Sequence, residues 1–320
     1  MRALPWIMSD IADQPPTSLS LSVAVHLHLF YPDLLPQFID RLKRIPVPFA
    51  LFVSVPEHVQ TDDDALAQIL QDNLPLSELK ICRTPNRGRD IAPMLCTFAN
   101  DLRRYDVMLH LHTKKSPHAA SQTGWLSFLL SYLLPNRFFI AAYLKRLQEG
   151  AGMIVPPNYL YPSIAGGWGD CRNMPLAQEL INRSNLNIDL LKDYPEIDFP
   201  QGSMFWARTD YLERLLTQDL GYEDFPEEPI GVDGTIAHAL ERLFFLWGHD
   251  SGMPLWRVYY SEADLQQAKR VQGDMRKLYD EYTRFVAKNK KNLRNFRITL
   301  YVAICAFVAF IVTLFFLLCA

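Results

Sequence analysis

Short apolar runs alternate with helical patterns along the first third of the chain. The apolar runs cover residues 22–30, 49–54, 79–83 and 107–112, and the helical patterns between them cover 34–43, 62–70 and about 91–102. Strands of about six residues that alternate with helices of about ten to fifteen are typical of βαβ units. The pattern therefore predicts an α/β fold with a mainly parallel sheet flanked by helices.

The second half of the chain has a less regular pattern. We expect two helices and two short strands, followed by a last helix: residues 125–134, 137–147, 152–157, 199–208 and 233–245. A long loop, 158–174, and an acidic loop, 223–231, lie between them. Because ligands of parallel sheets bind at the carboxyl ends of the strands, the polar residues directly after each strand are the first candidates for a site.

The C-terminal segment is the longest uncharged part of the chain. No residue from 298 to 320 is charged, and a helix of that length rises far enough, at about 1.5 Å per residue, to cross a hydrocarbon core of roughly 30 Å. The residues just before it include five basic ones: Lys288, Lys290, Lys291, Arg294 and Arg297. Such clusters mark the cytoplasmic flank of a span. We therefore expect a single-pass C-terminal membrane anchor and a cytoplasmic domain, the alternative being a buried core helix.

These patterns divide the chain into four parts. Residues 1–21 contain Pro5, Pro15 and Pro16 and are expected to form a flexible lead, without the apolar stretch of a secretory signal. A single globular domain is expected over 22–260. A charged helical linker, 261–297, then leads to the anchor, 298–320.

Composition narrows the classes of function. Of the 320 residues, 49% are hydrophobic and 21% are charged, as in ordinary globular proteins. The formal net charge of −3 lacks the basic footprint of a protein that binds nucleic acid. The five cysteines are widely spaced without a CxxC pair, which fits a reducing compartment and suggests neither a disulfide framework nor a zinc ribbon.

A basic segment follows the strand predicted at 107–112. His110 and His112 lie on one face of that strand, because side chains alternate along it. Lys114 and Lys115 come directly afterwards, between Thr113 and Ser116. Two lysines and two hydroxyls at the carboxyl end of a strand could hold a diphosphate. The alternative is a solvated basic loop.

A second candidate is residues 86–90, here called the arginine loop. It reads Asn86, Arg87, Gly88, Arg89 and Asp90. Gly88 allows backbone conformations that are closed to other residues, and the two arginines present fixed forks of donors. Asp90 could cap the next helix, whose N-terminus favours an anion. A turn with an N-cap explains Gly88 and Asp90 but not the two arginines.

The acidic loop and the helix after it form a third candidate. Asp233, or failing it Glu228, could act as a general base if burial raises its pKa. The simpler interpretation makes Asp233 the N-cap of that helix. His238 and Glu241 fall within one turn of each other, which favours an ion pair or a core hydrogen bond.

Two histidine pairs raise the alternative of a metal site. His26 and His28 repeat on the first strand the HxH spacing of His110 and His112. Neutral imidazoles suit zinc or iron, so a metal-dependent hydrolase is a rival interpretation, but the neighbouring lysines would oppose a cation. Residues 62–64 contain a DxD spacing that begins a helix, where acidic residues are favoured.

Taken together, these segments resemble the rhamnan synthesis protein F family of bacterial polysaccharide glycosyltransferases. Five blocks carry the resemblance, in the order of the family: residues 25–31, 86–90, 109–116, 199–206 and 233–242. The resemblance implies a GT-A-like domain that transfers a deoxyhexose, L-rhamnose from dTDP-rhamnose, during assembly of cell-wall polysaccharide or lipopolysaccharide. The acceptor would be a lipid-linked saccharide at the bacterial inner membrane.

The resemblance also implies roles for individual residues. In an inverting transfer, the arginine loop with His110, His112, Lys114 and Lys115 would bind the nucleotide diphosphate. Asp233 or Glu228 would take the acceptor proton. Side chains on the strand after residue 199 would line the acceptor side: Gln201, Ser203 and Trp206. The lysines stand where GT-A enzymes usually carry a DxD pair, so no metal cofactor is expected, with a divalent metal as the alternative. A non-catalytic assembly subunit remains a further alternative.

Overall fold

The computed structural model describes most of the chain before residue 271. The described residues are 1–11, 18–113, 115, 124–158, 167–169, 172–231, 233–270, 273, 277, 281 and 284. The chain divides into two units, Met1–Lys269 and Arg270–Ala320. The fold and the site below belong to the first unit. The predicted anchor, 298–320, lies outside the described residues.

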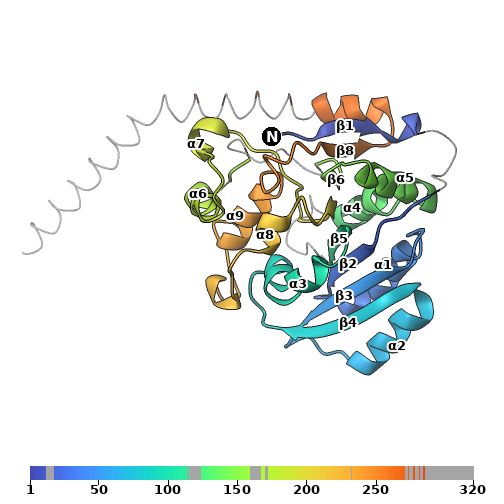
Figure 1. The fold of residues 1–320 in the computed structure, drawn as a ribbon. Coiled ribbons are helices and arrows are strands. Elements are labelled where there is room, and N and C mark those ends of the chain that lie inside the picture. Colours follow the sequence, from blue (N-terminus) through green and yellow to red (C-terminus); the bar gives the residue numbers. More distant parts are fainter. Residues whose placement is uncertain are drawn as a thin grey trace, which may run out of the picture. The chain divides into compact units, whose positions relative to one another are not determined.

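The first unit is built on one eight-stranded sheet with the order β1-β8-β6-β7-β5-β2-β3-β4 (Figure 1). The strands are β1 (Leu4–Ile7), β2 (Val23–His28), β3 (Phe49–Pro56), β4 (Leu76–Thr84), β5 (Val107–His112), β6 (Met153–Val155), β7 (Phe205–Arg208) and β8 (Leu255–Tyr259). Within the described sheet, β7 alone runs antiparallel to its neighbours. The predicted α/β fold with a mainly parallel sheet is confirmed.

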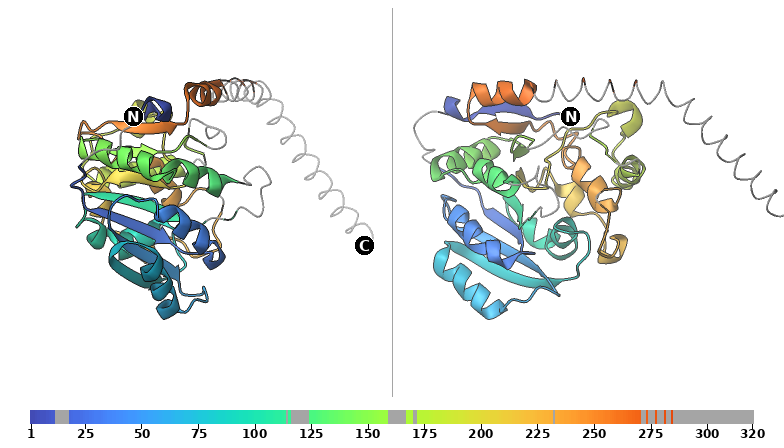
Figure 2. Two further views of the ribbon diagram at one scale, coloured as in Figure 1. Left: turned by 90° about the vertical axis from the view of Figure 1, so that its right-hand side faces the viewer. Right: turned by 180° about the vertical axis from the view of Figure 1, so that it is seen from behind.

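Helices cover both faces of the sheet. One face packs against η3 (Pro93–Thr97, a π-helical turn), α3 (Ala99–Leu102), α6 (Asn173–Arg183), α7 (Leu190–Asp193), α8 (Glu213–Leu216) and α9 (Ile236–Leu243). The other face packs against α1 (Leu35–Leu42), α2 (Asp63–Asn73), α4 (Trp125–Leu133) and α5 (Arg137–Gln148). Short 3-10 turns are η1 (Met8–Asp10), η2 (Pro32–Leu34) and η5 (Tyr222–Asp224). The two further views in Figure 2 show the same succession of strands, from β1 and β8 to β4.

Alternation along the strands creates these two cores. In β2, Val25 and Leu27 belong to the core beneath α1, α4 and α5, whereas Ala24 belongs to the core beneath η3 and α9. His26 and His28 follow the alternation of Ala24 and therefore face η3 and α9. The predicted histidine face is thus turned toward the helix that follows the acidic loop.

The chain order places a switch point beside β2. From β2 the chain runs outward to β3 and β4, and it then returns to form β5 on the opposite side of β2. In open α/β sheets the crevice at such a reversal, at the carboxyl ends of the strands, is the usual ligand site. The segments that follow β2 and β5 therefore form the expected mouth of a binding site.

Several predicted boundaries need correction. The lead is not flexible throughout, because β1 pairs in parallel with β8 and buries Trp6 and Ile7. The domain extends past residue 260, because residues 262–269 are helical and Leu265 packs against Ile7. The region around 91–102 contains a π-helical turn and a short helix rather than one continuous helix.

In the part of the chain that the structure describes, no single helix has the length and apolar character needed to cross a membrane. The bent pair α4 and α5 meets that criterion only when the two helices are taken together. The anchor predicted at 298–320 therefore stays a prediction.

Candidate functional site

A row of buried polar side chains crosses the sheet at the switch point. In the register of β2 and β5, His26 lies beside His110 and His28 beside His112. Ser54, near the end of β3, is paired with His28 on the other side of β2. His26, Ser54 and His110 are fully buried, so their polar atoms need partners within the protein.

These side chains bond to one another in a chain, here called the histidine relay. His28 Nδ1 lies 2.9 Å from Ser54 Oγ, which lies 3.0 Å from His26 Nε2. His26 Nδ1 lies 2.9 Å from His110 Nδ1, and His110 Nε2 lies 3.1 Å from Asp90 Oδ2. With neutral rings the donors have one consistent order. His28 donates to Ser54, Ser54 to His26, His26 to His110, and His110 to the carboxylate of Asp90.

Burial sets the protonation of the relay. Desolvation lowers the pKa of His26 well below its ordinary value and lowers that of His28 to about 3. For Asp90, burial alone would raise the pKa. The ring of His112 and the hydrogen bond from His110 outweigh burial and hold the pKa of Asp90 well below its usual range. The relay therefore ends in an ionised carboxylate held directly beside Arg89.

Two consecutive residues of the arginine loop, Gly88 and Arg89, have positive φ angles, which glycine favours and arginine does not. Gly88 has a φ of 64°, and a Cβ there would lie 2.4 Å from the Cβ of Ala92 and 2.5 Å from the ring of Phe225. Arg89 follows with a φ of 54°, which is uncommon for a residue with a side chain. Such conformations persist where the surroundings determine them, often at functional sites. Asp90 does not cap a helix as predicted, because its carboxylate serves the relay.

Both arginines of this loop reach the acidic loop. Arg87 forms an ion pair with Glu227, and Arg89 Nε lies 3.7 Å from Glu228 Oε1. Arg89 Nη2 also donates to Gly231 O at 3.3 Å. Exposed ion pairs contribute little to stability, typically below about 1 kcal/mol. These arginines can therefore exchange a glutamate for a ligand at small cost.

The start of α9 fixes the orientation of His238. Thr235 is the N-cap of this helix and forms a capping box with His238, whose Nδ1 accepts from the Thr235 N–H at 3.3 Å. Desolvation, aided by the nearby charge of Arg89, lowers the pKa of His238 to about 4. The ring is therefore neutral at physiological pH, and when its Nδ1 accepts from Thr235 its single proton lies on Nε2.

Arg89 and His238 consequently point two donors at the same place. Arg89 Nη1 lies 3.4 Å from His238 Nε2, and in the tautomer that carries its proton on Nε2 both nitrogens are donors and do not bond each other. Two N–H groups at this spacing are both satisfied by an acceptor placed between them, and an anion is the acceptor that Arg89 favours most. A phosphate oxygen placed between these two groups would accept a hydrogen bond from each.

Asp233 lies next to this pair in a dense hydrogen-bond network. Its Oδ1 accepts from Asn173 Nδ2 at 2.7 Å and from the N–H of Gly234 at 3.0 Å, and its Oδ2 accepts from Arg242 Nη2 at 3.1 Å. The carboxylate still keeps 25% of its side-chain surface exposed. The predicted N-cap role is wrong, because Thr235 caps α9.

The basic segment after β5 is described only in part. Lys115 is exposed at the carboxyl end of β5, where its ammonium lies 2.6 Å from Asp33 Oδ2 and 4.9 Å from the centre of the Tyr31 ring. Phe30 packs edge-on against Tyr31, and Thr113 Oγ1 accepts from the backbone N–H groups of both. Lys114, the other lysine expected to bind the diphosphate, lies outside the described residues.

The predicted binding residues are not all accessible. His110 is fully buried and His112 is 9% exposed, so His110 supports Asp90 instead of contacting a ligand. His112 Nε2 donates to Gly202 O at 2.8 Å, and Gly202 N donates to Glu241 Oε1 at 2.9 Å. These two bonds tie the residue 199–206 block to both β5 and α9.

The predicted acceptor residues need a similar correction. Trp206 is fully buried in the core on the α4 side of the sheet, where its indole donates to Leu133 O at 2.9 Å. It therefore cannot line an acceptor site, and Ser203, 5% exposed, is buried as well. Gln201 is partly exposed and stays a candidate. Asn86 is exposed on the arginine loop, and no contact in the structure tests its role.

The histidine pairs do not form the metal site of the rival interpretation. Two ring nitrogens that would have to turn toward an ion, those of His26 and His110, bond each other at 2.9 Å. Among the described residues, no group of three or more His, Cys, Asp and Glu side chains is arranged to hold a metal ion. The alternation of side chains correctly predicted that the histidines share one face of the sheet. On that face His110 bonds to the carboxylate of Asp90 and not to a metal ion.

Three residues of the site were missed in the sequence. Ser54 ends an apolar strand in register with the HxH pairs, and this position was its only signal. Asn173 and Arg242 hold Asp233 from α6 and α9. Asn173 has no local signal, and Arg242 is singled out only as the end of the 233–242 block, with no role of its own. Contacts between segments far apart in the chain produce these roles.

Comparisons with known proteins bear on this arrangement. Two curated relatives, each named uncharacterized protein WxcX, from two strains of Xanthomonas campestris pv. campestris, are 31% and 30% identical over 244 residues. That alignment covers 73% of this chain and 32% of each relative, so the chain spans about a third of their length. The crystal structure of S. aureus TarS 1-349 superposes on 70% of this chain and 54% of its own, with a TM-score of 0.35 and 11% identity, too remote for an inference about function. The rhamnan synthesis protein F family matches residues 3–253, and the chain belongs to that family.

Proposed function

We propose that this protein is a glycosyltransferase of polysaccharide synthesis that uses a nucleotide diphosphate sugar as donor. Membership of the rhamnan synthesis protein F family supports this class of reaction. In its full form the proposal is a GT-A-like enzyme that transfers rhamnose with inversion from dTDP-rhamnose. The acceptor is a lipid-linked saccharide at the cytoplasmic face of a bacterial inner membrane.

The observation that carries the proposal is the pair of donors on Arg89 and His238 at the switch point. Their nitrogens are 3.4 Å apart. The relay holds Asp90, the neighbour of Arg89, and the capping box at Thr235 fixes the orientation of His238. When a glycosidic bond to a diphosphate breaks, negative charge develops on the departing oxygens. Donors that are already fixed in place stabilise that charge without reorganisation.

Lys115 and the aromatic pair Phe30 and Tyr31 extend this donor site along the carboxyl edge. An aromatic face offers a surface on which a nucleobase can stack, and an ammonium beside it offers a charge for a phosphate. The three residues follow β2 and β5, the two strands that flank the switch point. We assign this edge to the nucleotide, and Arg87 to the same anion site as Arg89.

The proposed base is Asp233. An inverting transfer needs a base on the face of the sugar opposite to the leaving group. Glu228 pairs with Arg89, so a diphosphate bound to that guanidinium would compete with it and repel it. Asp233 is instead held by Asn173 and Arg242 with part of its carboxylate exposed.

A membrane anchor at 298–320 would keep the enzyme close to a lipid-linked acceptor and so raise the effective concentration of that acceptor.

A panel of nucleotide sugars tests this proposal. The full chain in detergent is screened for thermal stabilisation by each compound, and a ligand at a hundred times its dissociation constant adds roughly 2.7 kcal/mol. We expect dTDP-rhamnose to stabilise the protein most and to release dTDP when a lipid-linked saccharide is added. A protein that no nucleotide sugar stabilises would be a non-catalytic assembly subunit instead.

A further inference from the structure

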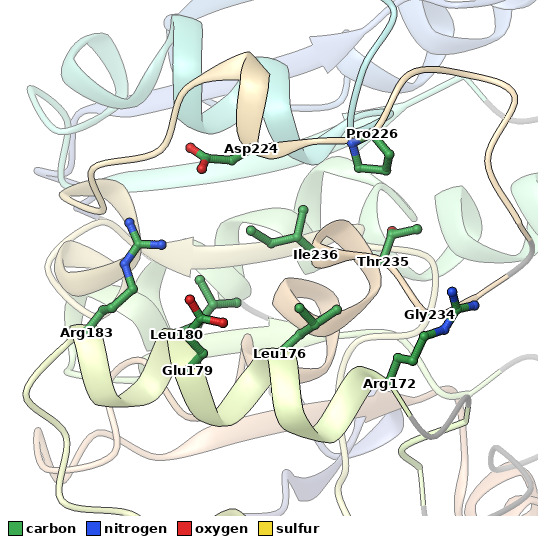
Figure 3. Close-up of a pocket in the computed structure, with 10 residues that line it drawn as sticks. All are labelled: Arg172, Leu176, Glu179, Leu180, Arg183, Asp224, Pro226, Gly234, Thr235 and Ile236. Atoms are coloured by element: carbon green, nitrogen blue, oxygen red, sulfur yellow. The ribbon is translucent and has the colours of Figure 1, made fainter.

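A hollow lies between α6 and the start of α9. Its volume is about 380 Å³, within the range of roughly 300–1,000 Å³ that is usual for small-molecule pockets. The close-up in Figure 3 shows α6 along the lower side, the start of α9 with Thr235 and Ile236 in the middle, and the chain around Asp224 and Pro226 above. We call this hollow the α6–α9 groove. The sequence patterns gave no indication of it, because α6 itself was not predicted.

The groove has an apolar floor and a charged rim. The floor is formed by Leu176, Leu180 and Ile236. The rim carries two guanidinium groups, Arg172 and Arg183, and two carboxylates, Glu179 and Asp224. Positions 172, 176, 179, 180 and 183 share one face because they are spaced three and four residues apart.

One end of the groove is lined by the residue next to the proposed base. Gly234 lines the groove, and its backbone N–H donates to the carboxylate of Asp233 at 3.0 Å. Gly234 has a φ of 84°, and a Cβ there would lie 2.5 Å from Arg172 Nη2, so the guanidinium of Arg172 packs directly on this glycine. Thr235, the residue that orients His238, is part of the same wall.

The balance of charges selects the ligand. Two arginines and two carboxylates leave the rim without net charge, and a phosphate group would meet Glu179 and Asp224 unfavourably. Carboxylates accept hydrogen bonds from hydroxyls and guanidinium groups donate to them, while an aliphatic floor covers the C–H face of a sugar ring. A neutral, hydroxyl-rich ring fits all of these features.

We propose that the α6–α9 groove binds the saccharide end of the acceptor and presents its hydroxyl to Asp233. This rests on the proposed function, because it assigns the second substrate of the same reaction. The predicted acceptor residues Ser203 and Trp206 are buried, and the groove takes over their role. The phosphate part of a lipid-linked acceptor lies outside the groove, away from Glu179 and Asp224.

The experiment measures two ligands on the full chain in detergent. A methyl-capped rhamnose disaccharide probes the groove by saturation-transfer NMR, and dTDP probes the donor site by calorimetry. The test variant is Glu179→Gln combined with Arg183→Gln, since both side chains are exposed. Lys145→Gln combined with Glu149→Gln is the matched control, another exposed pair spaced four residues apart on a helix.

We expect the test variant to bind the disaccharide at least tenfold more weakly while its dTDP affinity stays within twofold of the parent. The control should leave both affinities unchanged. Unchanged disaccharide binding in the test variant would overturn the proposal, as would a parent that binds dTDP but no disaccharide. Variant-sensitive binding of inorganic diphosphate in the groove would overturn it too, in favour of a phosphate site. Disaccharide binding without dTDP binding would keep the groove and refute the proposed donor site.

Discussion

His28, Ser54, His26 and His110 form a continuous chain of hydrogen bonds on one face of the sheet, and the chain ends at the carboxylate of Asp90. Each ring has its orientation fixed by the next, and the last bond holds Asp90 in place. The position of Arg89 depends on the relay, because Arg89 precedes Asp90 in the chain and has an unusual backbone conformation. The relay therefore acts on the proposed site by position, without touching a ligand.

The relay predicts a stability that depends on pH. The folded pKa values of His26 and His28 lie below the ordinary 6.5, the latter at about 3. Below about pH 6.5 the unfolded chain therefore binds protons that the folded chain does not. Stability should fall as the pH drops from 6.5 toward 3, by up to about 1.4 kcal/mol per pH unit for each histidine.

Urea denaturation of the full chain in detergent at pH 7.5, 6.0 and 5.0 measures this effect. Replacing His28 by Asn should flatten the pH dependence, since one of the two groups is removed. A free energy of unfolding that stays constant between pH 7.5 and 5.0 would show that the rings are not buried in neutral form.

Asp233→Asn tests the proposed base. A general base contributes roughly a hundred- to ten-thousandfold to rate, so turnover should fall by that order while the nucleotide sugar still binds. The change also weakens the ion pair with Arg242, but Glu241 keeps that guanidinium paired at 3.1 Å. Turnover and melting temperature are measured on the same samples.

Asn173→Ala serves as the control for this prediction. It removes a hydrogen bond to Asp233 and leaves the carboxylate, so we expect lower stability with turnover within tenfold of the parent. If Asp233→Asn is as active as the parent, Asp233 only holds α6 against α9, and the search for the base moves to Glu228.

At the scale of elements, the sequence predicts the regular part of the fold well. Strands β2, β3 and β5 and helices α4 and α5 lie where apolar periodicity places them, because each buries a face or a whole strand. β1 was missed because it is short and contains Pro5, and because within the described sheet it pairs with β8, far along the chain. The helix at α6 was missed although Ala177, Leu180 and Ile181 have a helical spacing.

The site shows the same division. The segments that meet at the switch point are the ones the sequence singled out, since strand ends of a parallel sheet share one edge. Residue roles within them were harder to predict. Trp206 lies in a segment that the sequence assigns to the acceptor, yet its side chain packs into the core on the α4 side of the sheet. Only the pairing of β7 with β5 determines which face of the sheet it takes.

The end of β5 predicts metal independence. The segment after this strand brings Lys115 to the edge, where a metal-binding DxD pair is otherwise expected, and a cationic side chain can offset diphosphate charge directly. Transfer activity should therefore persist in excess EDTA. Rates are compared with and without EDTA and after adding back manganese. Complete loss that manganese or magnesium restores would contradict this interpretation of the segment.

At the scale of the whole molecule, the anchor predicts where the protein resides. Residues 298–320 carry no charge and follow a basic cluster, so removing everything after Asn289 should release the protein into the soluble fraction with its fold intact. Fractionation followed by circular dichroism checks both parts. The full chain, treated with the same high-salt wash, is the control, and a shortened chain that still pellets with membranes would disprove the anchor.

The central claim is that a nucleoside diphosphate binds at the carboxyl ends of β2 and β5 against Arg89. Calorimetric titration of dTDP into the parent, Arg89→Ala and Arg104→Ala tests it most directly. Arg104 is a matched control, since its side chain is 50% exposed against 46% for Arg89, and it too pairs with a glutamate. A hydrogen bond to a charged group contributes about 1.5–3 kcal/mol, so Arg89→Ala should weaken dTDP binding roughly ten- to hundredfold. Arg104→Ala should bind dTDP as the parent does. Equal affinities in all three proteins would contradict the account.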